Sequence, residues 1–254
     1  MSESPDLHPD KETEAAALRA QLARAKGLRG AAAADPQRSA DRLRLREWQA
    51  ARLARTHADL LASERYGQGA AFFLSDLYGP KDFSERDDEI ERILPMMIAV
   101  LPAAGVRTVA LAVEVDALSE DLDAAVAQAL REAGRIDSID DNAYADAYRA
   151  CGHRPQRARQ IELIGDTGRT LARLTRMPFV ALALRLMHGP AHLAGLGELH
   201  AFLQRGFDAF LSMGDPEEFL EAIRLRETAV MERLFAGDPE PFALPAEAPA
   251  ITSG

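Results

Sequence analysis

No stretch of this chain alternates polar and apolar side chains with period two, whereas apolar residues recur every three or four positions in its most regular segments. The first pattern is typical of half-buried strands and the second of amphipathic helices. Aromatic residues make up only 6% of the chain, and its many alanines and leucines favour helix over sheet. We therefore predict an all-α fold, built as a single bundle of about seven to nine helices.

The ends of the chain differ from its middle. Residues 1–10 are polar and acidic, residues 237–254 are rich in Pro, Ala and acidic side chains, and both are expected to be disordered tails. Between them we predict one helical domain, 11–236, with a Gly/Ala break at 27–35. The expected helices are 12–26, 36–63, 65–78, one beginning at Ser84, 106–132 as one helix or as two with a restart at Ser119, 141–150, 157–187 with a break or kink at Pro178, 196–213 and 216–235.

Charge and cysteine content narrow the possible partners and location. The net charge of −10 argues against broad binding to nucleic acid, which needs a basic face. Cys151 is the only cysteine. The N-terminal residues lack the features of a signal peptide. The longest apolar run, 93–106, contains two prolines and is shorter than the roughly 20 residues that span a bilayer. We expect a cytoplasmic protein without membrane contact.

Two polar residues fall on the apolar faces of the last two predicted helices. At 100° per residue, His200 lies in the arc of Leu199, Phe202 and Phe207, and Glu227 lies near the centre of the next arc. The turn at Gly214 would place both at nearly the same height of an antiparallel hairpin. Because a buried carboxylate needs a partner, we predict that His200 or an arginine pairs with Glu227 inside the bundle.

That pair has two interpretations. It is either a structural polar clamp, which we favour, or an acid–base or ligand-binding pair. His188 and His192 are spaced like two ligands on one helix face, but Gly189-Pro190 separates them, so no metal site is predicted. If the bundle binds a ligand, the lining candidates are His200, Glu227, His188 and Tyr78.

Phe72 stands on the polar face of its predicted helix, near Gln68, Ser75 and Asp76. A phenylalanine there indicates that this face is also covered. Burial inside the monomer is the first interpretation, and a dimer or partner contact through Phe72 and Asp76 is the second.

Four other patterns carry weaker hypotheses. Asp87, Asp88 and Glu91 are similar to the aspartate-rich magnesium site of all-α prenyl-chain enzymes, with Asp140, Asp141 and Asp146 as a possible second cluster, although acidic residues are expected at helix starts. Cys151 and His153 lack a third catalytic partner. Six arginines at 38–55 form either a salt-bridged face or a contact for an acidic partner or RNA. Gly165, Gly168, Ala172 and Thr175 predict a close helix approach.

The run Phe72-Phe73-Leu74-Ser75-Asp76-Leu77-Tyr78, continuing to Pro80 and through Arg86 to Pro95, resembles the bacterial proteins named for a Phe-Phe-Leu-Glu-Glu-Leu-Tyr motif. The likeness reappears in 202–227. Here Ser75 and Asp76 stand where that motif has two glutamates. The resemblance implies a bacterial origin and carries no assigned activity or catalytic residue.

Because no motif for chemistry stands out, we predict no catalytic residue, no cofactor and no metal. The leading hypothesis is a non-catalytic binding protein, regulatory or scaffolding, that self-associates as a homodimer or binds a protein partner. The alternative is a bundle that holds an apolar small molecule or haem in its core. A magnesium-dependent all-α enzyme is the weakest of the three.

Overall fold

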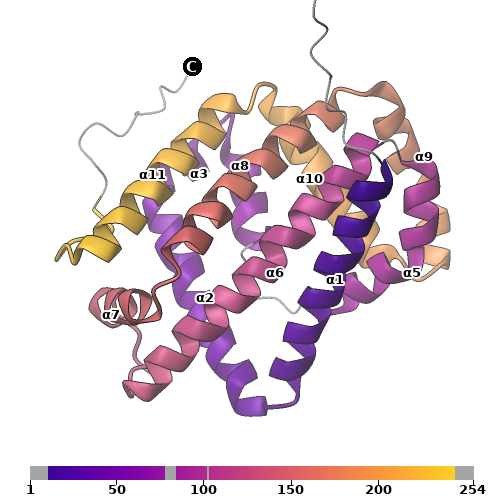
Figure 1. Cartoon of the computed structure of the whole chain (residues 1–254). Coiled ribbons are helices and arrows are strands. Elements are labelled where there is room, and N and C mark those ends of the chain that lie inside the picture. Colours follow the sequence, from indigo (N-terminus) through magenta and orange to yellow (C-terminus); the bar gives the residue numbers. More distant parts are fainter. Residues whose placement is uncertain (1–10, 78–83, 102, 244–254) are drawn as a thin grey trace, which may run out of the picture.

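The computed structural model describes residues 11–77, 84–101 and 103–243, and every regular element in them is helical (Figure 1). The elements are α1 (Lys11–Ala33), α2 (Pro36–Thr56), α3 (Ala58–Ala62), α4 (Gly67–Phe72), the π-helical turn η1 (Phe73–Leu77), α5 (Ser84–Val100), α6 (Ala103–Glu132), α7 (Asp141–Cys151), α8 (Arg154–Thr175), α9 (Pro178–Leu193), α10 (Gly197–Met213) and α11 (Glu217–Ala236). The all-α class is confirmed. Seven to nine helices was too few, since the described residues form eleven α-helices.

The extra helices come from breaks that periodicity does not reveal. The expected helix 36–63 divides at His57, whose φ of −117° and ψ of 28° lie outside the helical range. The Gly/Ala break expected at 27–35 was wrong, because α1 continues to Ala33. Its Leu22, Ala25 and Arg29 are buried, and this packing outweighs the low helix propensity of the two glycines. The break foreseen at Pro178 separates α8 from α9.

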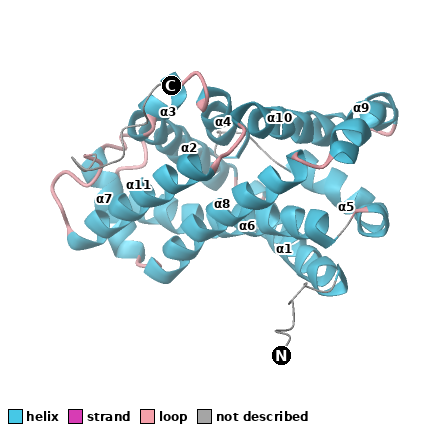
Figure 2. Ribbon diagram, turned by 90° about the horizontal axis from the view of Figure 1, so that it is seen from above, coloured by secondary structure: helices cyan, strands magenta, loops and turns pink. Residues whose placement is uncertain are grey.

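Helix α6 is the centre of the arrangement. It packs against α1, α2, α7 and α8. In both views α6 and α8 cross the middle of the molecule, with α7 and α9 at opposite ends (Figures 1 and 2). Helix α11 packs on α8 and α7, and Glu227 in its middle is hydrogen-bonded to Arg52 of α2.

Two small residues of α8 and α10 allow close packing. A Cβ on Gly168 would lie 2.4 Å from Cδ2 of Leu220, so the predicted close approach at Gly168 is to α11. A Cβ on Gly206 would lie 2.9 Å from Cζ of Phe72. Phe72 is only 5% exposed and its ring centroid is 5.5 Å from that of Phe202. Phe72 therefore belongs to the core of the monomer, which corrects its place among the interface candidates. The side chain of Asp76 and all of Tyr78 lie outside the described residues.

The first part of the predicted disordered tail is placed on the bundle. Residues 237–243 form turns, and the ring of Phe242 contacts those of Trp48 and Tyr144 at centroid distances of 5.8 and 6.1 Å. This partly buried aromatic ring packs against the core and extends it beyond Ala236. In the part of the chain that the structure describes, no helix is both long enough and apolar enough to cross a membrane.

Candidate functional site: a polar cavity beside Glu227

A cavity of about 120 Å³ lies among α2, α6, α7, α8, α11 and the segment from α4 to η1. Part of its lining is apolar and includes Phe73, Ile164, Ile223 and Val230. The lining also contains charged side chains, the arginines Arg46, Arg52 and Arg157 and the carboxylates Asp116, Asp123 and Glu227. A cavity lined by both apolar and charged side chains is suited to a small molecule that has both characters.

Glu227 faces the interior and is held by two residues from the other end of the chain. Nη1 of Arg52, on α2, lies 2.7 Å from Oε1 and 2.8 Å from Oε2 of Glu227. Nε2 of His57 donates to Oε1 over 2.9 Å, because an ionised carboxylate can only accept. The side chain of Glu227 is 14% exposed and that of Arg52 is 9% exposed. The predicted pairing of Glu227 with an arginine inside the bundle is therefore confirmed.

Sequence patterns did not identify His57 and Arg52 as the partners of Glu227, although Arg52 lies in the arginine stripe at 38–55. Arg52 follows Leu45 and Trp48 by seven and four positions, which places it on their apolar face and was the available signal. His57 gave no signal, because its orientation depends on the break between α2 and α3. Its Nδ1 and the Nε of Arg52 are buried without a hydrogen-bond partner, so the site retains unused hydrogen-bonding capacity.

Burial alone would raise the pKa of Glu227, but Arg52 and His57 outweigh it and hold this pKa at about 2. The folded-state value is lower than the ordinary 4.5, so ionised Glu227 stabilises the fold fully above about pH 4.5. We expect about 3 kcal/mol of unfolding free energy to be lost as the pH falls from about 4.5 to about 2. Urea unfolding measured at several pH values across this range tests the expected loss. The unfolding free energy of the variant Glu227→Gln should depend less steeply on pH than that of the parent chain. Equal slopes for the two proteins would contradict the assignment of this pH dependence to Glu227.

His200 does not reach Glu227. It is 6% exposed and donates from Nε2 to the carbonyl oxygen of Leu184 over 2.8 Å. The rings of His188 and His192 lie 5.2 and 6.4 Å from its ring. Of the two partners predicted for Glu227, an arginine or His200, the structure therefore shows the arginine, since His200 turns towards α9 instead of α11. Among the described residues, no group of histidines, cysteines and carboxylates is arranged to hold a metal ion.

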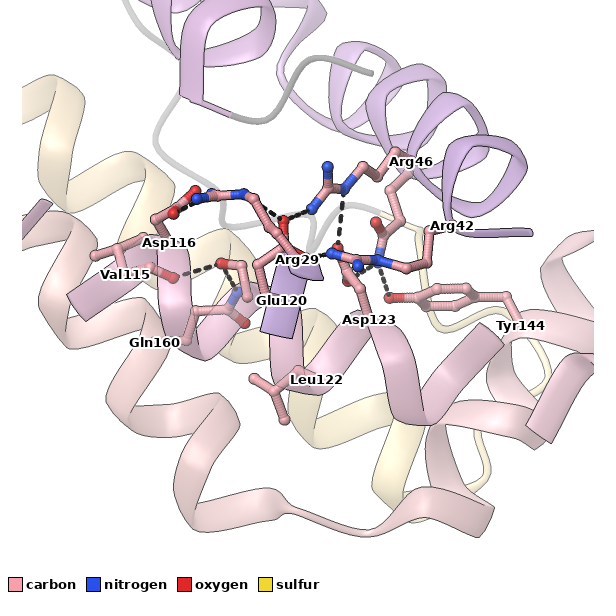
Figure 3. A network of polar contacts seen from close by, with 12 residues as sticks. Arg29, Arg42, Arg46, Val115, Asp116, Glu120, Leu122, Asp123, Tyr144 and Gln160 are labelled. Atoms are coloured by element: carbon pink, nitrogen blue, oxygen red, sulfur yellow. Dashed lines mark hydrogen bonds and ion pairs between the residues drawn. The ribbon is translucent and has the colours of Figure 1, made fainter. Parts of the chain in front are cut away.

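A second polar network borders the cavity between α1, α2 and α6 (Figure 3). Its centre is Glu120, whose side chain is 1% exposed and forms ion pairs with Arg29, Arg42 and Arg46. Burial, together with the nearby charge of Arg46, lowers the pKa of Arg42 to about 10. Asp116 pairs with Arg29. Most of the predicted arginine stripe therefore pairs with acids of this chain, as the salt-bridged interpretation proposed.

Arg157 differs from the other lining arginines because the described residues provide no carboxylate for it. It is 7% exposed. Its hydrogen bonds are long and go to neutral acceptors, the carbonyl oxygen of Leu122 at 3.3 Å and Oε1 of Gln160 at 3.4 Å. Its guanidinium lies 4.6 Å from the ring centroid of Tyr148. The hydroxyl of Tyr148, which also lines the cavity, has no hydrogen bond within the described residues. Sequence patterns did not single out either residue.

The remaining acidic candidates already have partners. Asp88 and Glu91 pair with Lys26, and Asp140 caps α7 by accepting from the amide of Ala143 at 2.7 Å. Asp146 pairs with Arg149. The side chain of Asp87 lies outside the described residues. Burial raises the pKa of Cys151, which keeps its thiol protonated and weakly nucleophilic.

A family model described as "Domain of unknown function (DUF8198)" matches residues 28–241. The match spans every residue that lines the cavity. No curated protein and no solved structure matches the chain. These comparisons do not address the resemblance to the Phe-Phe-Leu-Glu-Glu-Leu-Tyr proteins, which stays a prediction.

Proposed function

We propose that this chain, which belongs to the DUF8198 family of domains of unknown function, is a binding protein that takes up a small organic carboxylate in the cavity beside Glu227. The observation that carries the proposal is Arg157, a buried guanidinium that faces the cavity and lacks a counter-charge among the described residues. A buried charge is costly unless it is paired. A bound carboxylate would supply the missing partner.

The charges of the cavity wall support an anionic head group. Arg52 is paired with Glu227, and Arg46 with Glu120. Arg157 is therefore the lining arginine that forms no ion pair with a described carboxylate. Guanidinium is the cation best suited to a carboxylate, because its planar N–H groups match the two oxygens. The free hydroxyl of Tyr148, next to Arg157, is a second donor for the same head group.

The apolar lining residues and the volume of the cavity define the non-polar part of the ligand and its size. Phe73, Ile164 and Ile223 present hydrocarbon to the cavity. Its volume of about 120 Å³ is slightly smaller than the engineered protein cavities of about 150 Å³ that hold benzene. The space suits a short alkyl chain or a single ring. Haem is far larger than this cavity, and His200 and His188 do not line it, so of the apolar small molecule and the haem considered from the sequence only a small molecule fits, and Arg157 favours one that carries a carboxylate.

The lining groups favour binding over catalysis. Glu227 has a pKa of about 2 and is a weak base. Nε2 of His57 is occupied by Glu227, and burial raises the pKa of Tyr148. General acid–base catalysis works best with groups whose pKa lies near the working pH. Binding without chemistry agrees with the regulatory role that the sequence suggested.

Butyrate is expected to raise the free energy of unfolding, whereas butyramide at the same concentration and ionic strength has little effect. At a concentration about 100 times the dissociation constant, the gain is about 2.7 kcal/mol. The measurement is urea unfolding with each compound. Benzoate and benzamide form a second matched pair that tests the size of the cavity.

The variant Arg157→Met separates a ligand-binding role from a structural one. It removes an unpaired buried charge, so the ligand-free variant should be as stable as the parent chain or more stable. It should also lose the stabilisation by butyrate. A large loss of stability without ligand, or unchanged stabilisation by butyrate, would contradict the proposal.

A further inference from the structure

Helix α9 exposes an unusual amount of hydrophobic surface. Of the ten large hydrophobic side chains that are exposed in the described residues, five lie on this one helix. Leu193 is 92% exposed and Leu186 is 67% exposed. The others are Phe179, Leu182 and Met187. Single exposed leucines are ordinary, but a concentration on one helix indicates an interaction surface.

Four of these side chains form one continuous stripe. At 100° per residue, Phe179, Leu182, Leu186 and Leu193 fall within about 60° of one another. The opposite side of α9 carries the buried Ala191 and faces α10. The stripe is therefore turned away from the bundle, at the end of the molecule opposite to α7 (Figures 1 and 2).

We propose that the stripe of Phe179, Leu182, Leu186 and Leu193 is the surface through which two copies of this chain form a homodimer. Their successive spacings of three, four and seven residues are those of a helix-pairing seam. In a twofold dimer the same surface of each copy meets itself, and a helix with an apolar stripe satisfies this requirement directly. Gly189 lies beside the stripe with open space around its Cα, so a side chain of the second copy can approach there.

The charge distribution favours a second copy over other occupants. Helix α9 contains no acidic residue, and Arg185 is its only arginine or lysine. A strongly charged partner would find little to pair with on this helix. Helices that lie on membranes carry a basic face that attracts anionic lipids, whereas this chain has few lysines and a net charge of −10.

The surface area sets the strength of the dimer. With exposed fractions of 54% for Phe179, 57% for Leu182, 67% for Leu186 and 92% for Leu193, the whole stripe offers on the order of 500 Å² per copy, using ~200 Å² for a large apolar side chain. Two copies would bury about 1,000 Å² in total, which is at the lower limit for a specific interface. The dimer should therefore dissociate on dilution.

Sedimentation velocity of the full chain over a dilution series tests the proposal. The expected result is a monomer–dimer equilibrium, weakened about tenfold or more in Leu182→Glu and in Leu186→Glu. The matched control is Leu211→Glu on α10, because Leu211 is 55% exposed, close to the 57% of Leu182. All three substitutions lie on the surface, so circular dichroism and urea unfolding should show a folded protein with little change in stability.

Three results would overturn the proposal. The first is a monomer at every concentration, and the second is a dimer that Leu182→Glu and Leu211→Glu weaken equally. The third is flotation of the parent chain, but not of Leu186→Glu, with vesicles of phosphatidylcholine and phosphatidylglycerol, which would assign the stripe to a lipid surface.

Discussion

Replacing Glu227 with alanine is expected to lower the free energy of unfolding by about 3–5 kcal/mol, because it leaves the buried guanidinium of Arg52 without a counter-charge. In the parent chain Nη1 of Arg52 lies 2.7 Å from Oε1 of Glu227, and His57 donates to the same oxygen. Since Nε of Arg52 already lacks a partner, the cation would keep little compensation. Urea unfolding of the two proteins at neutral pH gives the difference.

The double variant Arg52→Met/Glu227→Leu separates the cost of an unpaired charge from the contribution of the pair. Replacing both charged groups with apolar ones removes the unpaired cation, so most of the stability should return. The control for a simple loss of a carboxylate is Glu221→Ala, on the same helix. Its partner Arg224 is 39% exposed and Glu221 is 41% exposed, so the loss should be below about 1 kcal/mol. Equal losses in Glu227→Ala and Glu221→Ala would show that Glu227 is not buried in solution.

Replacing Glu120 with glutamine is the second change with a large expected effect, again about 3–5 kcal/mol. Glu120 is 1% exposed and lies among Arg29, Arg42 and Arg46 (Figure 3). Glutamine keeps the size but removes the negative charge, so the three guanidinium groups repel one another with less compensation. The lowered pKa of Arg42, about 10, already reflects burial and the charge of Arg46.

Thermal or urea unfolding of Glu120→Gln measures this loss, and raising the salt concentration should recover little of it, because buried charges are weakly screened. Asp121→Asn is the matched control, since Asp121 lies next in sequence on α6 but is 37% exposed and pairs with the exposed Arg24. A Glu120→Gln variant as stable as Asp121→Asn would contradict the buried network.

Helical class and several helix limits could be predicted because they depend on local sequence. Pro178 starts a helix since its ring fixes φ and its nitrogen has no proton to donate. The inward face of Glu227 also follows from local spacing, because α11 is regular from Glu217 to Ala236. Where the local signal was weak, as at Gly27 and His57, the prediction of helix limits failed.

The partners of Glu227 could be predicted only as a class of residue. The sequence by itself determined that a carboxylate would be buried. It also determined that an arginine or a histidine had to pair with it, because a buried charge is very costly unless it is paired. Only the tertiary structure decided on Arg52 and His57, which are 175 and 170 residues away in the chain. The choice depends on how α2 ends and how α11 packs across it. Arg157 was left without an acid for the same reason, since helix packing determines which charges meet.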